Sequence, residues 1–139
     1  MIFFAPALVF AAITMSQARI MPGFLVSATL QDGKTVSGSF PYDTFEFVAV
    51  SSSREVVKVS IQKSSERPEP NVACEIEWLS ERKLFVIRQP AWTGELVRLW
   101  ERLDLLGEDG SPVTIRGEDV KKIRFVYVDR VHKTLARSH

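Results

Sequence analysis

The sequence predicts one mostly β domain, a small and strongly bent antiparallel β-barrel that carries one main α-helix. Apolar and polar side chains alternate through about eight short segments separated by turn residues, which is typical of strands. Only the segment from 93 to 106 has apolar residues at helical spacing. A length of 139 residues, with 45% apolar and 25% charged residues, is ordinary for a single globular domain.

The first predicted strands form a hairpin. Residues 24–30 alternate, Asp32-Gly33 is a strong hairpin-turn signal, and residues 35–40 alternate again, so these two segments should pair. A bend then leads into a third strand over 45–50, and residues 57–61 alternate as a fourth. The polar stretch 63–71, which contains two prolines, is predicted to be a loop.

The region 51–112 is expected to insert a loop, a hairpin and a helix into the barrel. The hairpin would join strands over 74–78 and 84–87. The helix would span 93–106, with Thr93 as its N-cap and Gly107 as its C-cap. Its apolar face would consist of Leu96, Leu99, Trp100, Leu103 and Leu106.

The remaining chain is expected to complete the sheet and to end in a basic tail. Residues 113–115 and 123–127 have the alternation of two further strands. A short helix is expected from Arg130 onward, within a basic C-terminal tail at 130–139. The barrel domain as a whole would span 19–139.

Residues 1–18 contain no charged side chain and form a separate apolar N-terminal segment. The apolar run is too short to cross a bilayer comfortably, so no membrane span is expected, but it suits the core of a signal peptide. Two other interpretations stay open, a buried first element and a start codon assigned too early, with Met15 or Met21 as the true start. The protein would be cytoplasmic without a cleaved signal, and periplasmic or secreted with one.

The charge distribution is uneven. The net charge of +1 predicts no strong overall attraction to nucleic acid or acidic membranes. Residues 119–139 nevertheless have a local charge of +4, which can attract an anionic partner and is also typical of a solvated strand face. The basic residues of this segment are Lys121, Lys122, Arg124, Arg130, Lys133 and Arg137.

No motif predicts catalysis, a cofactor or a metal site. The chain lacks a glycine-rich phosphate loop and a nucleophile elbow, so we expect no enzyme and no cofactor. Cys74 is the only cysteine and alternates with apolar residues, which indicates a small buried side chain. Only His132 and His139 could join it, and this set does not match a metal site.

Two segments resemble the two motifs of the Sm-like family of small β-barrels. Residues 26–50 contain an alternating strand, an Asp-Gly turn, a strand with Gly38, and an Asp-containing bend into a third strand. Residues 113–123 contain Ile-Arg-Gly followed by Val, which is similar to the second motif. The resemblance implies an Sm-like or SH3-like barrel, although the roughly 60 residues between the two segments depart from the family's short connection.

The same resemblance implies an RNA-base site. Phe45 would stack on a base and Arg116 would cover its other face. Phe47 occupies the position of the amide that reads the base edge in the family, so base-specific recognition is not implied. Without the resemblance, Phe45 and Phe47 are simply core aromatics of one strand face.

Three functional hypotheses follow. The first is a non-enzymatic β-barrel module that binds protein partners or assembles with itself. The second is an Sm-like RNA-binding protein that uses the region of Phe45 and Arg116 together with the basic C-terminal residues. The third is an exported periplasmic or secreted domain.

Overall fold

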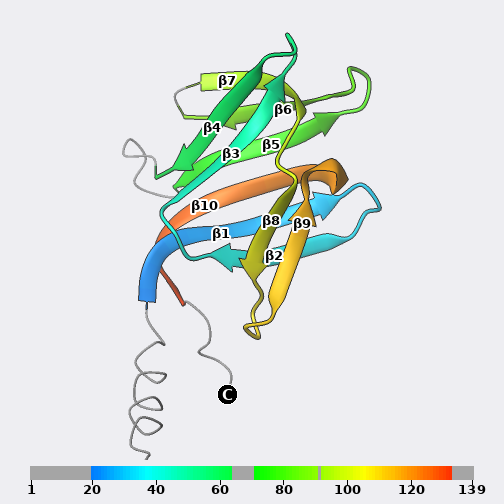
Figure 1. Cartoon of the computed structure of the whole chain (residues 1–139). Helices are drawn as coiled ribbons and strands as arrows, with labels where there is room; N and C mark the ends of the chain where they lie inside the picture. The colour runs from blue at the N-terminus through cyan, green and yellow to red at the C-terminus, as the bar shows by residue number, and fades with distance from the viewer. Residues whose placement is uncertain (1–19, 64–70, 91, 133–139) are drawn as a thin grey trace, which may run out of the picture.

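The computed structural model describes residues 20–63, 71–90 and 92–132, which form one open antiparallel sheet of ten strands (Figure 1). The strand order is β4-β3-β7-β6-β5-β10-β1-β2-β8-β9. The strands are β1 (Ile20–Leu30), β2 (Thr35–Phe40), β3 (Thr44–Ser51), β4 (Val56–Gln62), β5 (Val72–Leu79), β6 (Leu84–Gln89), β7 (Trp92–Arg98), β8 (Arg102–Leu106), β9 (Pro112–Arg116) and β10 (Val120–His132). A 3₁₀ turn, Gly117–Asp119, connects β9 to β10.

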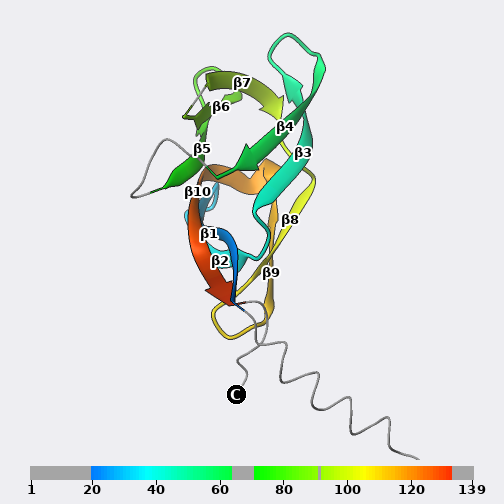
Figure 2. The same cartoon turned by 90° about the vertical axis from the view of Figure 1, so that its left-hand side faces the viewer.

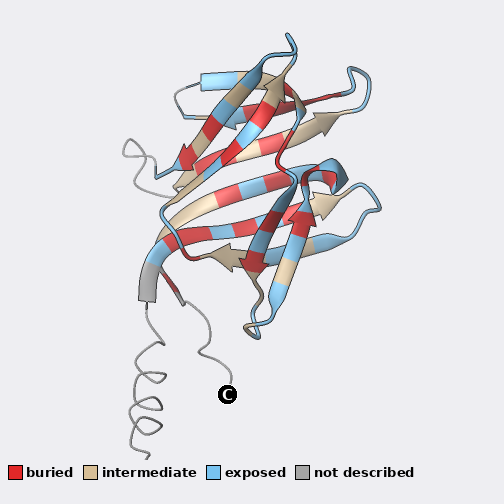
Figure 3. Cartoon of the chain, in the orientation of Figure 1, coloured by how far each residue is buried: buried red, intermediate tan, exposed pale blue. Residues whose placement is uncertain are grey.

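The strand predictions are confirmed. Each of the eight alternating segments lies within a strand, and the β1–β2 hairpin turns at Asp32-Gly33, where Gly33 has a positive φ of 89°. The predicted hairpin over 74–78 and 84–87 is the β5–β6 pair. Figure 3 shows why these segments could be predicted as strands: buried and exposed residues alternate along most of them.

The predicted helix over 93–106 is wrong, and the described part of the chain contains no α-helix. The segment forms β7 and β8, joined by a corner at Leu99 and Trp100. Both corner residues are buried. In β8 the buried Leu103 and Leu105 alternate with exposed Arg102 and Asp104. Two strands and a buried corner therefore reproduced the spacing of one helical face.

The predicted closed barrel is also wrong. The sheet is open, and its two edge strands are β4 and β9. Because residues 92–106 add two strands instead of a helix, β7 joins β3 to β6 and β8 joins β2 to β9. The sheet is thereby extended rather than closed. The helix expected from Arg130 is not found at its start, since β10 continues to His132, and residues 133–139 lie outside the described residues.

The open sheet folds over on itself to enclose a core. Figure 2 shows β3, β4, β8 and β9 on one side of the molecule and β5 and β10 on the other. Aromatic rings join the two sides, because Phe45 of β3 stacks on Phe125 of β10 at 5.9 Å and Phe47 of β3 meets Trp100 at 4.9 Å. The core therefore lies between the two sides and leaves the outer face of β5, β10, β1 and β2 available for other contacts.

Candidate functional site

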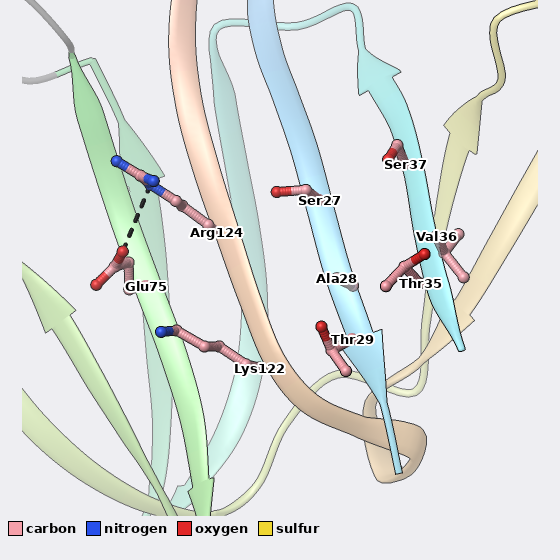
Figure 4. Close-up of a pocket in the computed structure, with 9 residues that line it drawn as sticks. All are labelled: Ser27, Ala28, Thr29, Thr35, Val36, Ser37, Glu75, Lys122 and Arg124. Carbon is pink, nitrogen blue, oxygen red and sulfur yellow. Dashed lines mark ion pairs between the residues drawn. The ribbon is translucent and has the colours of Figure 1, made fainter. Parts of the chain in front are cut away.

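One hollow of about 230 Å³ lies on the outer face of the sheet, across β5, β10, β1 and β2 (Figure 4). We call it the outer-face hollow. Its residues are mostly hydroxyl-bearing or charged: Ser27, Ala28, Thr29, Thr35, Val36, Ser37, Glu75, Lys122 and Arg124. Strand alternation explains this composition, because the odd-numbered residues of β1 and the even-numbered residues of β10 point away from the core.

The register of the strands arranges these side chains in two rows. Ser27 of β1 is paired with Arg124 of β10 on one side and with Ser37 of β2 on the other. In the next row, Thr29 of β1 is paired with Lys122 of β10 and with Thr35 of β2. Directly opposed side chains in a sheet lie about 5 Å apart, so each row places one hydroxyl of β1 beside a cation of β10 and a second hydroxyl, from β2, one strand farther away.

The charges of the hollow are only partly neutralised. Arg124 pairs through Nε with Oε2 of Glu75 at 3.4 Å. The ammonium group of Lys122 forms no hydrogen bond or ion pair with the described residues, and the same holds for the four hydroxyls of the hollow. Within the described chain, one cation and four hydroxyls are therefore available to a ligand.

A second, larger hollow lies between the β2–β3 connection and β8, and we call it the aromatic groove. Its volume is about 520 Å³. It is lined by Phe40, Pro41, Tyr42, Phe45, Arg102, Leu103, Asp104, Leu105, Leu106 and Pro112. The ring of Tyr42 is 5.1 Å from that of Phe40, which is 5.3 Å from that of Phe45. Tyr42 is 52% exposed and is the most accessible aromatic side chain of the groove.

Charged groups stand beside this apolar lining. Oδ1 of Asp104 accepts a hydrogen bond of 2.9 Å from the Thr114 hydroxyl, and Oδ2 accepts one of 3.2 Å from Arg102. The hydrogen bond from Thr114, followed by that from Arg102, lowers the pKa of the Asp104 carboxyl. Asp104 therefore stays ionised at neutral pH, so the groove combines an apolar floor with a fixed pair of charges.

The structure does not place Phe45 and Arg116 around one hollow. The ring of Phe45 is half-buried and packs on Phe47 at 5.4 Å and on Trp100 at 5.5 Å. Arg116 is exposed, pairs with Glu118 at 3.2 Å, and is not part of the lining of the aromatic groove. Phe45 thus acts as a core aromatic that reaches the groove at its edge.

The other cations expected to bind nucleic acid are divided between several places. Lys122 and Arg124 share the outer-face hollow, whereas Lys121 is exposed and does not line it. Arg130 lies in β10, but its side chain is outside the description. Lys133 and Arg137, like the apolar segment 1–18, lie outside the described residues.

Sequence reasoning missed the hydroxyls of the outer-face hollow and Tyr42 of the aromatic groove. The alternation of 24–30 and of 35–40 already places Ser27, Thr29, Thr35 and Ser37 on the polar side of the first hairpin. Their position beside Lys122 and Arg124 depends on the pairing of β1 with β10, which joins segments about 90 residues apart, and no local pattern indicates it.

The buried polar groups of the described residues do not form a further site. Cys74 is fully buried, as predicted, and burial followed by the nearby Glu75 raises the pKa of its thiol. Within residues 20–63, 71–90 and 92–132, no cluster of acidic, histidine and cysteine side chains could hold a metal ion. The same residues include no helix with the length and apolarity of a membrane span.

Comparisons with known proteins do not assign a family. A scan against protein-family models, a search of curated proteins and a search of solved structures each return no match. The two hollows are therefore the features of the described chain that bear on its function.

Proposed function

We propose that this protein is a non-enzymatic binding module that contacts a protein partner through the aromatic groove. The observation that carries the proposal is the half-exposed ring of Tyr42, which stands on Phe40 at the mouth of an apolar hollow. Aromatic side chains on a rigid apolar support are the residues that most often dominate protein interfaces. The other support comes from the groove's size, since ligand-binding hollows commonly measure roughly 300 to 1,000 Å³.

The charges at the groove add orientation to this apolar contact. Asp104 and Arg102 form one ion pair there, so a partner can place a cation and an anion against them without burying an unpaired charge. The aromatic rings that support Tyr42 continue into the core through Phe40 and Phe45. This continuity holds the groove in shape before a partner arrives, which lowers the entropic cost of binding.

A peptide-display selection against the whole chain tests the proposal. The selected peptide is measured by calorimetry against the parent protein and two variants. Tyr42→Ala should weaken binding about thirtyfold or more, because hot-spot aromatics contribute at least about 2 kcal/mol. Val48→Ala is the matched control, since Val48 is 62% exposed on β3 and does not line the groove. Equal effects of the two substitutions, or no selectable peptide, would contradict the proposal.

Self-association is the special case in which the partner is a second copy. Sedimentation velocity over a range of concentrations detects it directly. If Tyr42→Ala abolishes a concentration-dependent dimer and Val48→Ala does not, the groove is the self-contact. A parent chain that stays monomeric leaves a different protein as the partner.

RNA binding is a second candidate, and the specific observation in its favour is the unpaired ammonium of Lys122 beside Arg124. These two cations were expected to contact nucleic acid, and they lie together on one face. A gel shift with single-stranded RNA at low salt tests this candidate. Absence of binding at about 50 mM salt, where electrostatic attraction is strong, would contradict it.

A further inference from the structure

We infer that the outer-face hollow is a binding site for a phosphate group, held by Lys122 and the surrounding hydroxyls. The site lies on a different face from the aromatic groove, so it goes beyond the proposed contact with a protein. It also makes the RNA-binding candidate more specific. The chain would recognise the phosphate backbone of the RNA and not a base stacked on Phe45.

The donors of the hollow match the acceptors of a phosphate. A phosphate presents several oxygen atoms that accept hydrogen bonds, and each hydroxyl can donate one and an ammonium group three. Ser27 on β1 and then Ser37 on β2 follow Arg124 in one row, and Thr29 and then Thr35 follow Lys122 in the next. Hydrogen bonds to a charged acceptor are stronger than neutral ones, so this donor set favours an anion over a neutral ligand.

The charge of the hollow also favours an anion. Lys122 and Arg124 face a single carboxylate, Glu75, among the lining residues. Glu75 is already paired with Arg124 at 3.4 Å, and Glu77, which lies opposite Lys122 on β5, is paired with Arg88 at 3.4 Å. The ammonium group of Lys122 therefore forms no ion pair with the described residues. Figure 4 shows Glu75 beside Arg124 on the side of β5, away from Ser37 and Thr35 on β2. In the same view the side chain of Lys122 also extends toward β5, so its ammonium group must swing back over β10 to reach an anion bound beside the hydroxyls of β1 and β2.

The hollow offers no means of holding a base or a sugar ring by stacking. Its lining contains no aromatic side chain. Sequence-specific recognition of single-stranded RNA depends largely on such stacking. The shared chemistry of the ligand is therefore the phosphate group itself, whether it belongs to an RNA backbone or to a small phosphate ester.

The experiment is a titration of the full chain with inorganic phosphate, in which nuclear magnetic resonance measures the chemical shifts of the backbone amides. We expect shifts at Ser27, Thr29, Thr35 and Lys122, and a saturable curve. Lys122→Gln should weaken binding about fivefold, the factor that one exposed contact charge supplies in water. Lys121→Gln is the matched control, because Lys121 is the adjacent exposed lysine and does not line the hollow.

A second variant predicts a change of opposite sign. Glu75→Gln removes the carboxylate and releases Arg124, so phosphate should bind about fivefold more tightly. A misfolded variant would not show this gain. The inference is overturned if phosphate shifts no amide around the hollow, if Lys121→Gln and Lys122→Gln weaken binding equally, or if Glu75→Gln fails to tighten it.

A second binding experiment, with fluorescent oligouridine and oligoadenine, distinguishes an RNA backbone from a small phosphate ester as the source of the phosphate. If the two oligonucleotides bind with similar affinity, and Lys122→Gln weakens their binding as well as that of inorganic phosphate, the ligand is an RNA backbone. If inorganic phosphate binds and neither oligonucleotide does, the ligand is a small phosphate ester. Tyr42→Ala serves as the link to the proposed function, since it should weaken the selected peptide and leave the phosphate titration unchanged.

Discussion

The indole nitrogen of Trp100 donates a hydrogen bond of 3.2 Å to the carbonyl oxygen of Ile115. Both residues are buried, and the bond ties the corner between β7 and β8 to strand β9. The same indole ring meets Phe47 and Phe125, so the corner is held from both sides of the core. The β7–β8 corner is thus a structural junction and not a surface loop.

Trp100→Phe should destabilise the protein by about 1 to 3 kcal/mol, because the buried carbonyl of Ile115 would lose its donor. Urea unfolding followed by circular dichroism measures the change. Trp92→Phe is the control, since the Trp92 side chain is 44% exposed at the start of β7. We expect a change of about 0.5 kcal/mol or less for the control. Similar losses in both variants would show that the Trp100 hydrogen bond adds no stability of its own.

Gly117→Ala should also destabilise this junction. A Cβ atom at Gly117 would collide with the backbone carbonyl of Trp100 and lie 3.0 Å from the Cβ of Leu99. Neither neighbour is the end of a flexible side chain, so the backbone itself must shift, at a cost of about 1 to 3 kcal/mol. Urea unfolding compares it with Glu118→Ala, which removes only an exposed side chain and its ion pair with Arg116. A Gly117 variant as stable as the Glu118 variant would mean that the turn can move freely.

The strands could be predicted because their residues obey a local rule. Phe24, Val26 and Ala28 are buried and alternate with exposed Leu25 and Ser27, as expected for a strand with one face in the core. The turn at Asp32-Gly33 is likewise a short-range signal. Local alternation and turn chemistry are therefore sufficient for most of the strands of this fold.

The helix prediction failed because the same apolar spacing has two structural explanations. Leu96, Leu99, Trp100 and Leu103 follow helical spacing, and all four are buried. They are buried by different elements, because Leu96 lies in β7, Leu103 in β8, and the other two in the corner. The alternation of β8 was the competing signal, and only its pairing with β9 and β2 decides between the two. That pairing is a tertiary effect that a sequence window does not contain.

The candidate sites also depend partly on local sequence signals and partly on long-range strand pairing. Lys122 and Arg124 can be assigned to one face from strand period alone. Their meeting with Ser27 and Thr29 requires the long-range pairing of β1 with β10. The expected partnership of Phe45 with Arg116 came from the resemblance to the Sm-like motifs, and in the structure the ring of Phe45 stacks on Phe125. Strand period therefore assigns residues to a face, whereas long-range pairing decides which faces meet.

Leu103→Ala should cost about 2 to 5 kcal/mol, the usual range for a buried leucine replaced by alanine. Leu103 is 1% exposed and lies on the inner face of β8, beneath the aromatic groove. Leu25→Ala is the control, because Leu25 is 50% exposed on β1. Thermal and urea unfolding should rank the two variants far apart. A loss below about 0.5 kcal/mol for Leu103→Ala would place that side chain outside the core.

Alkaline pH should destabilise the protein through Cys74. Burial raises the pKa of its thiol above the ordinary value of 9.0, so above that pH the unfolded chain loses a proton that the folded chain keeps. Stability is then complete below about pH 9 and falls as the pH rises, by up to about 1.4 kcal/mol per pH unit. Urea unfolding between pH 8 and 10 measures the slope, and Tyr127, whose pKa burial also raises from 10.0, adds to it only near the upper end of this range. Cys74→Ala should lower stability at every pH but remove the decline above pH 9, whereas parallel curves for the two proteins would show that another group causes it.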